Sequence, residues 1–159
     1  MNSQEIRSKF LSFFENIVAK SETSNYEVSI ELQEFFLAIY KTFESSQELL
    51  RNDISDSDRK TILDGLGNAG SEFRESVYFS GFSNNKISIS KNEILDFVKI
   101  SNSFLEHSIR ANKRKDNLYH AYNLMTVSSS STVSVSYLDE MLEGQVAVLS
   151  SKYLKSEEV

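Results

Sequence analysis

The stretch KISISKNEILDFVKI, residues 86–100, contains the change of pattern on which the fold prediction rests. Its first five residues predict a short extended arm, which follows a turn at 81–85. Ser90 and Glu93 then have the spacing of a capping box, in which side chains satisfy the free backbone N–H groups at a helix start. We therefore predict a helix from this point to about Asn112. Its apolar stripe consists of Ile94, Phe97, Val98, Leu105 and Ile109.

The N-terminal segment has the same helical spacing of apolar residues. A first helix is predicted over residues 4–20, and Asn2 with Glu5 approximates a capping box at its start. The apolar stripe of this helix consists of Ile6, Phe10, Phe13, Phe14, Ile17 and Val18.

A second helix is predicted to open at Ser24, because Glu27 follows at capping-box spacing. It continues for about 25 residues, near the long end for a globular helix. Because only the short segment SETSN (21–25) separates the first two helices, we expect them to pack antiparallel. The stripe of the second helix consists of Val28, Leu32, Phe35, Phe36, Ile39, Phe43 and Leu50.

A third helix is predicted over residues 56–80, and its middle contains Gly65, Gly67 and Gly70. An interior glycine costs about 1 kcal/mol relative to alanine. The segment therefore either breaks here or passes close to another backbone, and we favour one helix with a tight crossing. A phosphate-binding loop is not indicated, because no strand precedes these glycines and no Gly-Lys-Ser/Thr follows.

The pattern changes after the fourth helix. Residues 118–127 and the alternating residues 133–137 predict the two arms of a β-hairpin spanning 118–137, with a serine-rich tip. A last helix is predicted from about Leu138, with Leu138, Met141, Leu142, Gln145 and Leu149 on one side. The predicted fold class is mainly α: four to five helices in antiparallel helical hairpins, with one late β-hairpin. We treat residues 1–159 as one domain or fragment.

Composition narrows the function. A net charge of −6 argues against nucleic-acid binding, which needs clustered positive charge. The absence of cysteine excludes disulfides and thiolate chemistry, the two histidines match no standard metal spacing, and nothing indicates another cofactor. No apolar run approaches the roughly 18 residues of a membrane span. We expect a cytoplasmic protein if the chain is complete, whereas the location stays open if it is a fragment.

The C-terminal residues KSEEV, 155–159, have the pattern of a helix start. Ser156 precedes two acidic residues, which the positive end of a helix dipole favours. A single turn cannot sustain itself as a helix. The segment is therefore either a frayed polar tail or the beginning of a helix that a longer chain completes.

A resemblance supports the longer chain. The motifs HSIR at 107–110, LYHAYNLM at 118–125 and EMLEGQVAVLSS at 140–151 resemble parts of large uncharacterised bacterial proteins of the cellobiose-phosphorylase-like, carbohydrate-active group. The resemblance covers roughly residues 71–158, and no tested reaction is tied to those proteins. It implies a segment of an α/α toroid, sugar as the substrate class and an intact protein several times longer.

The first candidate site surrounds His120. In the predicted strand this residue lies between Tyr119 and Tyr122, with Asn123 next, and neither strand face is purely apolar. Histidine and tyrosine combine flat rings with hydrogen-bonding tips, which suits a sugar. The alternative is that the tyrosines pack in the core and His120 bonds a backbone carbonyl.

The second candidate is the basic patch of Arg110, Lys113, Arg114 and Lys115. At the C-terminal end of a helix these side chains complement the dipole, which alone explains them. The alternative is a site for phosphate or an acidic partner. Arg110 is then the favoured ligand, because His107 shares its helix face.

The third candidate is Glu140, which lies with Glu143 in the predicted last helix. Two residues three apart on a helix point the same way, whereas the carboxylates of a glycosidase flank the scissile bond. At most one of the two can serve, with a partner from elsewhere. The alternative is that Asp139 and Glu140 merely stabilise the first turn.

Two functions therefore remain. The chain is either a helical segment of a carbohydrate-active protein, inactive alone, or a freestanding acidic helical module that binds a protein partner. Both predict exposed apolar surface and self-association. In the first case the ligand-facing residues are Arg110, Tyr119, His120, Tyr122, Asn123 and Glu140.

Overall fold

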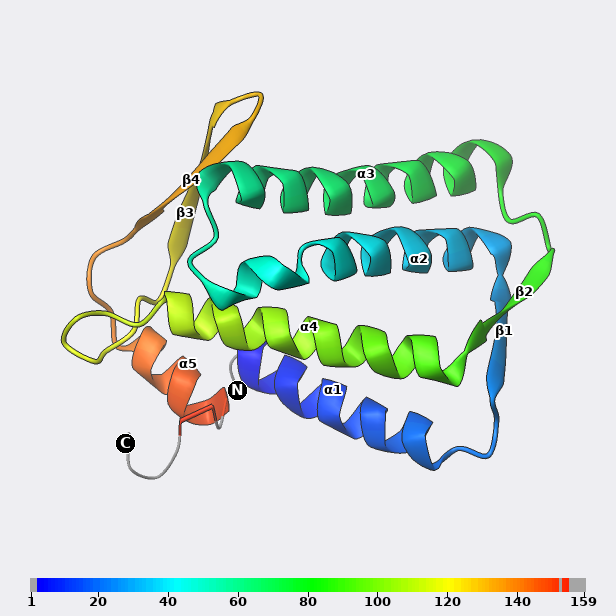
Figure 1. Ribbon diagram of the computed structural model, residues 1–159, viewed down its shortest axis with the longest axis horizontal. Coiled ribbons are helices and arrows are strands. Elements are labelled where there is room, and N and C mark those ends of the chain that lie inside the picture. The colour runs from blue at the N-terminus through cyan, green and yellow to red at the C-terminus, as the bar shows by residue number, and fades with distance from the viewer. Residues whose placement is uncertain (1–2, 152, 155–159) are drawn as a thin grey trace.

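Four long helices lie side by side in the order α3, α2, α4, α1 (Figure 1). The computed structural model describes residues 3–151 and 153–154, with side chains from Phe10 onward. The helices are α1 (Ser3–Lys20), α2 (Ile30–Ser45), the 3-10 helix η1 (Gln47–Arg51), α3 (Asp56–Ser80), α4 (Lys91–Ala111) and α5 (Glu143–Ser151). The strands are β1 (Asn25–Ser29), β2 (Lys86–Ser90), β3 (Asn123–Ser129) and β4 (Thr132–Tyr137). The described residues are mainly α with a late β-hairpin, as predicted.

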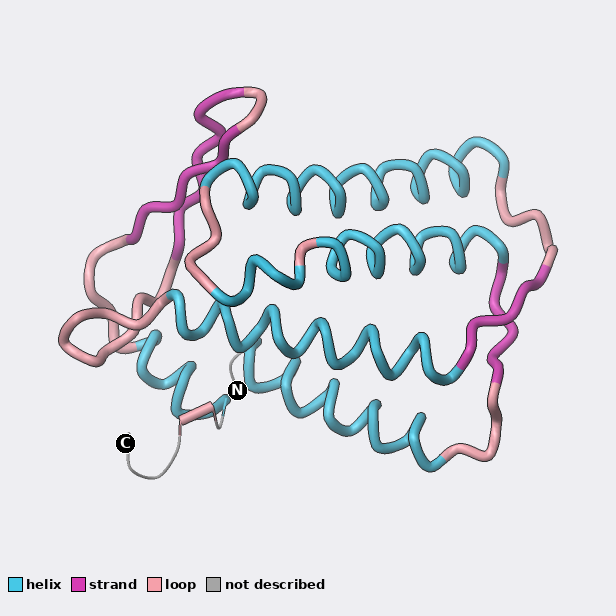
Figure 2. The backbone as a smooth tube through the Cα atoms, in the orientation of Figure 1, coloured by secondary structure: helices cyan, strands magenta, loops and turns pink. Residues whose placement is uncertain are grey.

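The element order helix–strand–helix occurs twice, once as α1–β1–α2 and again as α3–β2–α4. The two short strands pair antiparallel at one end of the layer, from Asn25 opposite Ser90 to Ser29 opposite Lys86 (Figure 2). Each strand ends in a serine that caps the following helix. Identical or similar residue types occur again 61 positions later in the chain. The pairs are Val28 and Ile89, Ser29 and Ser90, Phe36 and Phe97, Ile39 and Ile100, and Phe43 and Phe104.

Corresponding residues meet at the centre of the layer. The ring centroids of Phe36 and Phe97 are 5.2 Å apart, and those of Phe43 and Phe104 are 4.6 Å apart. Contact between equivalent side chains is expected where a local two-fold axis runs between two elements. The central pair α2–α4 therefore relates the two halves of the layer.

The tight helix crossing predicted from the glycines is confirmed at Gly65. A Cβ atom at this position would lie 2.8 Å from both Cγ2 and Oγ1 of Thr42 on α2. Gly67 and Gly70 have no such neighbour within 4 Å. Helix α3 is continuous, and one of its three interior glycines permits the close approach of α2.

The predicted start of the second helix is wrong. Residues 25–29 form β1, because their backbone groups pair with β2 instead of continuing into a helical ladder. The helix begins at Ile30, where the Ser29 hydroxyl accepts a hydrogen bond from Leu32 N at 3.2 Å. It ends at Ser45, and η1 follows.

The predicted pairing of the first two helices is also wrong. The β1–β2 ribbon separates them, so α1 packs against α4 and α5, whereas α2 packs against α3 and α4. The predicted cap at Asn2 lies outside the described residues.

The fourth helix and its capping box are confirmed. Glu93 N donates to the Ser90 hydroxyl at 3.2 Å, and Ser90 N donates to the Glu93 carboxylate at 2.8 Å. These bonds lower the pKa of Glu93. The helix ends at Ala111, with Asn112 as its C-cap.

The C-terminal elements are shorter than predicted. Strand β3 begins at Asn123 rather than 118, and α5 begins at Glu143 rather than Leu138. The buried side of α5 is also different, because it consists of Gly144, Ala147, Val148 and Ser151. Leu138, Met141, Leu142 and Leu149, which were expected on one inward side, are exposed. The predicted helix start at 155–159 lies outside the described residues.

Exposed apolar surface is found, as predicted. The accessible surface is 10749 Å², against about 8,100 Å² for a compact monomer of this mass. On α1 the predicted core stripe is only partly buried. Val18 is buried, the side chain of Ile6 lies outside the described part, and Phe13 is 63% exposed; the exposed members are Phe10, Phe13, Phe14 and Ile17. Among the described residues, no helix is both long enough and apolar enough to cross a membrane.

Candidate functional site

A groove of about 480 Å³ lies where the hairpin meets the start of α3 and the end of α4. One part of its lining is apolar and includes Ile54, Ile62, Leu63, Phe104, Met125 and Val135. The polar part consists of Asp53, Arg59, His107, Ser108, Asn112, Asn123 and Tyr137. We call this space the helix-side groove.

The hairpin contributes one of its two faces to this groove. Asn123 pairs with Tyr137 across the hairpin, and Met125 pairs with Val135. Residues directly opposite each other, and residues two apart on one strand, share a face. The register therefore brings these four side chains to the groove together.

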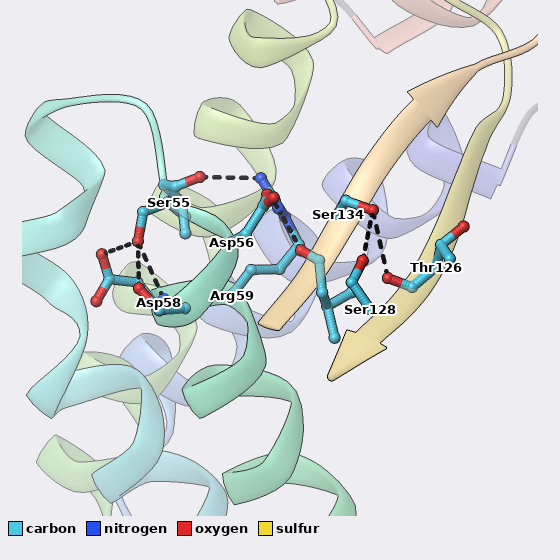
Figure 3. Close-up of polar contacts among 10 residues, drawn as sticks. Ser55, Asp56, Asp58, Arg59, Thr126, Ser128 and Ser134 are labelled. Carbon is cyan, nitrogen blue, oxygen red and sulfur yellow. Dashed lines mark hydrogen bonds and ion pairs between the residues drawn. The ribbon is translucent and has the colours of Figure 1, made fainter. Parts of the chain in front are cut away.

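Arg59 fixes the hairpin against α3 (Figure 3). Its Nη1 donates to the Val133 carbonyl at 2.7 Å, and its Nη2 donates to the Ile54 carbonyl at 2.9 Å. The Asp56 carboxylate pairs with the same guanidinium, and Ser55 caps the helix just before it. Hydrogen bonds from a charged donor are stronger than neutral ones, so this clamp sets the position of the groove wall.

Two side chains of α4 hold the segment after η1. His107 is buried, and its Nε2 hydrogen-bonds the Asn52 carbonyl at 2.9 Å. Arg110 Nη2 donates to the Leu50 carbonyl at 3.0 Å. The two residues share a helix face as predicted, but Arg110 does not line the groove.

Asn112 carries a polar atom without a partner at the groove wall. Its Nδ2 donates to the Ser108 carbonyl at 2.7 Å, while its Oδ1 is buried and accepts no hydrogen bond within the described structure. A buried acceptor without a partner is costly. Because the atom has almost no accessible surface, a ligand hydroxyl would reach it only after rotation of the Asn112 side chain.

A second hollow of about 420 Å³ adjoins the groove and shares Ala111 and Tyr137 with it. The His120 ring stacks on the Tyr137 ring, with centroids 3.8 Å apart and an interplanar angle of 9°. The other lining residues are Lys113, Arg114, Lys115, Asp116 and Glu140. We call this space the loop-side hollow.

The loop-side hollow contains both signs of charge. Arg114 pairs with Asp116 at 2.7 Å and with Glu140. Desolvation lowers the pKa of Arg114, but hydrogen bonds and charge attraction from the two carboxylates outweigh it, so the pKa is raised overall. Within the described structure Lys113 and Lys115 have no carboxylate partner, and they leave the hollow with excess positive charge.

The remaining predicted residues are distributed differently. Tyr119 is buried in the core with Ile109 and Val148. Tyr122 is exposed and lines neither space. The predicted strand faces around His120 are wrong, because residues 118–122 lie outside the hairpin strands.

Close packing of α5 explains why this segment is not a strand. A Cβ atom on Gly144 would lie 2.6 Å from the Tyr119 carbonyl oxygen. Gln145 bonds the same residue twice, accepting from Tyr119 N at 3.0 Å and donating to Tyr119 O at 2.8 Å. The backbone of Tyr119 is thus satisfied by a side chain of α5 instead of by a neighbouring strand.

Several important residues were missed. Tyr137 closes the alternating strand pattern, so its place opposite Asn123 follows once the hairpin register is known. Arg59 and Asn112 carry no signal in the sequence, because their partners are backbone atoms far along the chain or within one helical turn.

The carboxylates do not form an opposed pair. Asp53 is the carboxylate in the described lining of the helix-side groove, and the two in the loop-side hollow are paired with Arg114. No group of three His, Asp or Glu side chains that could hold a metal ion occurs in the described part of the chain.

No family model matches this chain, and no curated protein matches it.

Proposed function

We propose that the chain is a helical segment of a carbohydrate-active protein, and that the helix-side groove binds a sugar. The observation that carries the proposal is that Tyr137 lines this groove together with Asn112, whose Oδ1 has no partner within the described residues, while the Tyr137 ring stacks on His120 of the adjoining loop-side hollow. The resemblance of residues 71–158 to carbohydrate-active bacterial proteins supports the same substrate class.

The chemistry of the groove matches that of a sugar. A sugar ring has apolar C–H faces and a rim of hydroxyls, and aromatic side chains offer flat apolar area with a polar tip. Asn123 offers an amide donor and Asp53 an acceptor along the lining. The groove volume of about 480 Å³ is within the roughly 300–1,000 Å³ of known ligand sites.

The isolated chain is proposed to bind without turnover. Hydrolysis of a glycosidic bond needs two carboxylates that flank it, and the described lining of the groove offers Asp53 alone. We expect no release of monosaccharide or sugar phosphate from disaccharides, with or without phosphate. Turnover that is abolished by Asp53→Asn would contradict this part of the proposal.

Calorimetric titration with mono- and disaccharides tests binding. We expect saturable binding that Tyr137→Ala and His120→Ala weaken at least tenfold. Tyr122→Ala is the matched control, because this tyrosine is exposed and lines neither space. Equal loss in all three variants, or no binding of any sugar by the folded chain, would refute the sugar site.

The exposed stripe on α1 favours a second candidate, a freestanding acidic helical module that binds a protein. Phe10, Phe13, Phe14 and Ile17 follow helical spacing, as do the anchors of helices that dock in grooves. In that case Phe13→Ser would abolish binding of a protein partner and leave the sugar titration unchanged. Loss of sugar binding in Phe13→Ser would reject this separation of surfaces.

A further inference from the structure

The two edges of the β3–β4 hairpin are treated differently by the rest of the molecule. Strand β4 packs against α3, and its residue Val133 is buried. Every residue of β3 is exposed. The edge of β3 that does not pair with β4 is therefore not covered by α3.

The clamp by Arg59 reveals which backbone groups lie on the open edge. Because the Val133 carbonyl bonds Arg59, it points away from β3, and Val127 opposite Val133 belongs to a non-hydrogen-bonded pair. Such pairs alternate along an antiparallel ladder, so Met125 and Asn123 have the same orientation. Their N–H and C=O groups, with those of Val127, point outward from β3.

Two further contacts agree with this assignment. The Ser134 hydroxyl donates to the Thr126 carbonyl at 3.4 Å, so that carbonyl lies on the inner side of the ladder. Leu138 N donates to the Tyr122 carbonyl at 3.4 Å, which continues the inward set one step beyond the ladder.

The open edge carries no charged residue and no proline, and its ladder is irregular only at the far end, between Val127 and Ser129. Natural edge strands are blunted by charged residues or proline, because a free row of N–H and C=O groups recruits other strands. From Asn117 to Leu138 there is no Asp, Glu, Lys, Arg or Pro, although 25% of the chain is charged. Met125 is 62% exposed and Val127 is 69% exposed. Such an edge is a ready template for pairing with another strand.

We propose that β3 pairs antiparallel with β3 of a second copy of this chain. A net charge of −6 opposes contact between two copies, and the uncharged hairpin is a surface where they can approach without like charges facing each other. With Met125 opposite its own copy on the two-fold axis, Asn123 lies opposite Val127. Every outward N–H and C=O group of these three residues then meets a partner.

The predicted dimer is reversible. A seven-residue strand offers less area than the roughly 800 Å² per partner of a standard interface, so we expect dissociation in the micromolar range. The pairing uses the edge of the hairpin, whereas the proposed sugar groove uses one of its faces. The inference therefore does not depend on the proposed function.

Sedimentation of the full chain over a range of concentrations tests the pairing, with two substitutions at one position. Met125→Pro removes an outward donor and leaves the β3–β4 ladder bonds in place, so it is expected to weaken dimerisation at least tenfold. Met125→Ala keeps the donor and is expected to change the dissociation constant less than threefold. Met125→Lys, which places like charges opposite each other, replaces the proline variant if circular dichroism shows that the latter is unfolded.

Cross-linking tests the register independently, because the chain contains no cysteine. Oxidised Met125→Cys is expected to form a covalent dimer, since directly opposite residues are within disulfide reach. Leu124→Cys is the matched control and is expected to remain monomeric, because its copy is displaced along the strand. Equal cross-linking of both variants, a monomer at all concentrations, or a dimer lost in Phe13→Lys and retained in Met125→Pro would overturn the proposal.

Discussion

The helix pairs α2–α3 and α4–α1 are related by the local two-fold axis, yet their outer helices are held in different ways. Helix α3 fits closely against α2 at Gly65, and the rings of Phe35 and Phe73 stack with centroids 4.8 Å apart. Helix α1 is tied at its end, where Lys91 Nζ donates to the carbonyls of Ala19 at 2.9 Å and Ser21 at 2.8 Å.

The difference follows from a few residues of the central helices. The position of Phe35 on α2 corresponds, 61 residues later, to Asp96 on α4, which is exposed. A carboxylate cannot receive a phenyl ring as a phenylalanine does, because its own burial is costly. The same backbone plan thus gives an outer helix whose Phe73 ring is stacked on the central layer in one half, although Tyr78 and Phe79 near its end are exposed, and an outer helix with exposed Phe10, Phe13 and Phe14 in the other.

Truncation of one aromatic side chain on each outer helix gives the largest expected contrast. Phe73→Ala removes a stacked ring and is expected to lower the free energy of unfolding by about 3 kcal/mol. Phe13→Ala removes an exposed ring and is expected to change it by less than about 0.5 kcal/mol. Urea unfolding at low protein concentration measures both, and a similar loss in the two variants would break the comparison.

The close approach of α2 and α3 predicts a second contrast. Gly65→Ala places a Cβ against Thr42, whose rotamer is held by a 2.9 Å bond to the Ala38 carbonyl, so we expect a loss of about 1–3 kcal/mol. Gly67→Ala meets open space and is expected to gain about 0.5–1 kcal/mol from helix propensity.

Thermal unfolding of the two alanine variants distinguishes these effects. Thr42→Ala introduced beside Gly65→Ala is expected to recover stability by removing the clash. No recovery would show that the crossing is held by other contacts.

The end of α1 provides a third test. Lys91→Ala removes two bonds from a charged donor to the last turn of α1, which we expect to weaken that helix by about 1–2 kcal/mol. Amide hydrogen exchange should therefore accelerate in α1 and remain unchanged in α3. Lys99→Ala is the control, since Lys99 pairs only with exposed Asp96. Unchanged exchange in α1 would mean that its packing against α4 and α5 holds it without the Lys91 bonds.

The smallest expected effect is a loss of stability in acid. Each half contains a carboxylate with a lowered pKa, and the two carboxylates have different hydrogen-bond partners. Hydrogen bonds from Ser90 lower the pKa of Glu93 below its ordinary value of 4.5. The ionised Glu93 carboxylate therefore stabilises the fold fully above pH 4.5. This stabilisation is lost as the pH falls through the lowered pKa that Glu93 has in the folded state. Glu93→Gln is expected to remove a few tenths of a kcal/mol of pH dependence, measured by urea unfolding between pH 7 and 3.

Glu31 provides the counterpart in the other half. Its pKa is lowered by hydrogen bonds from Ser83, whose N donates to the carboxylate at 2.8 Å. Part of the pH dependence should therefore persist in Glu93→Gln and disappear when Glu31→Gln is added. A flat pH profile in Glu93→Gln alone would contradict the assignment to both carboxylates.

Local patterns in the sequence predicted much of the fold. The capping box at Ser90 and Glu93 was confirmed because all its partners lie within three residues of each other. The identical spacing at Ser24 and Glu27 failed, because pairing of β1 with β2 supplied the competing backbone bonds. A capping pattern alone does not distinguish these outcomes.

The candidate site was less predictable than the fold. His120, Asn123 and Glu140 were identified from sequence and do line the two adjoining spaces. Tyr119 was predicted to face the ligand with them, but it is buried. The sequence pattern did not reveal this, because the burial depends on Gly144 and Gln145 of α5. Whether these spaces hold a sugar stays a prediction.

The amino-acid sequence by itself determined the helical content, the unbroken α3, the start and end of α4 and the presence of the hairpin, because periodicity, caps and alternation act within a few residues. Only the tertiary structure decided which face of each helix is covered. Amphipathic spacing identifies the apolar stripe of a helix, but it does not specify which element packs against that stripe. On α1 Val18 of that stripe became buried, whereas Phe10, Phe13, Phe14 and Ile17 remained exposed.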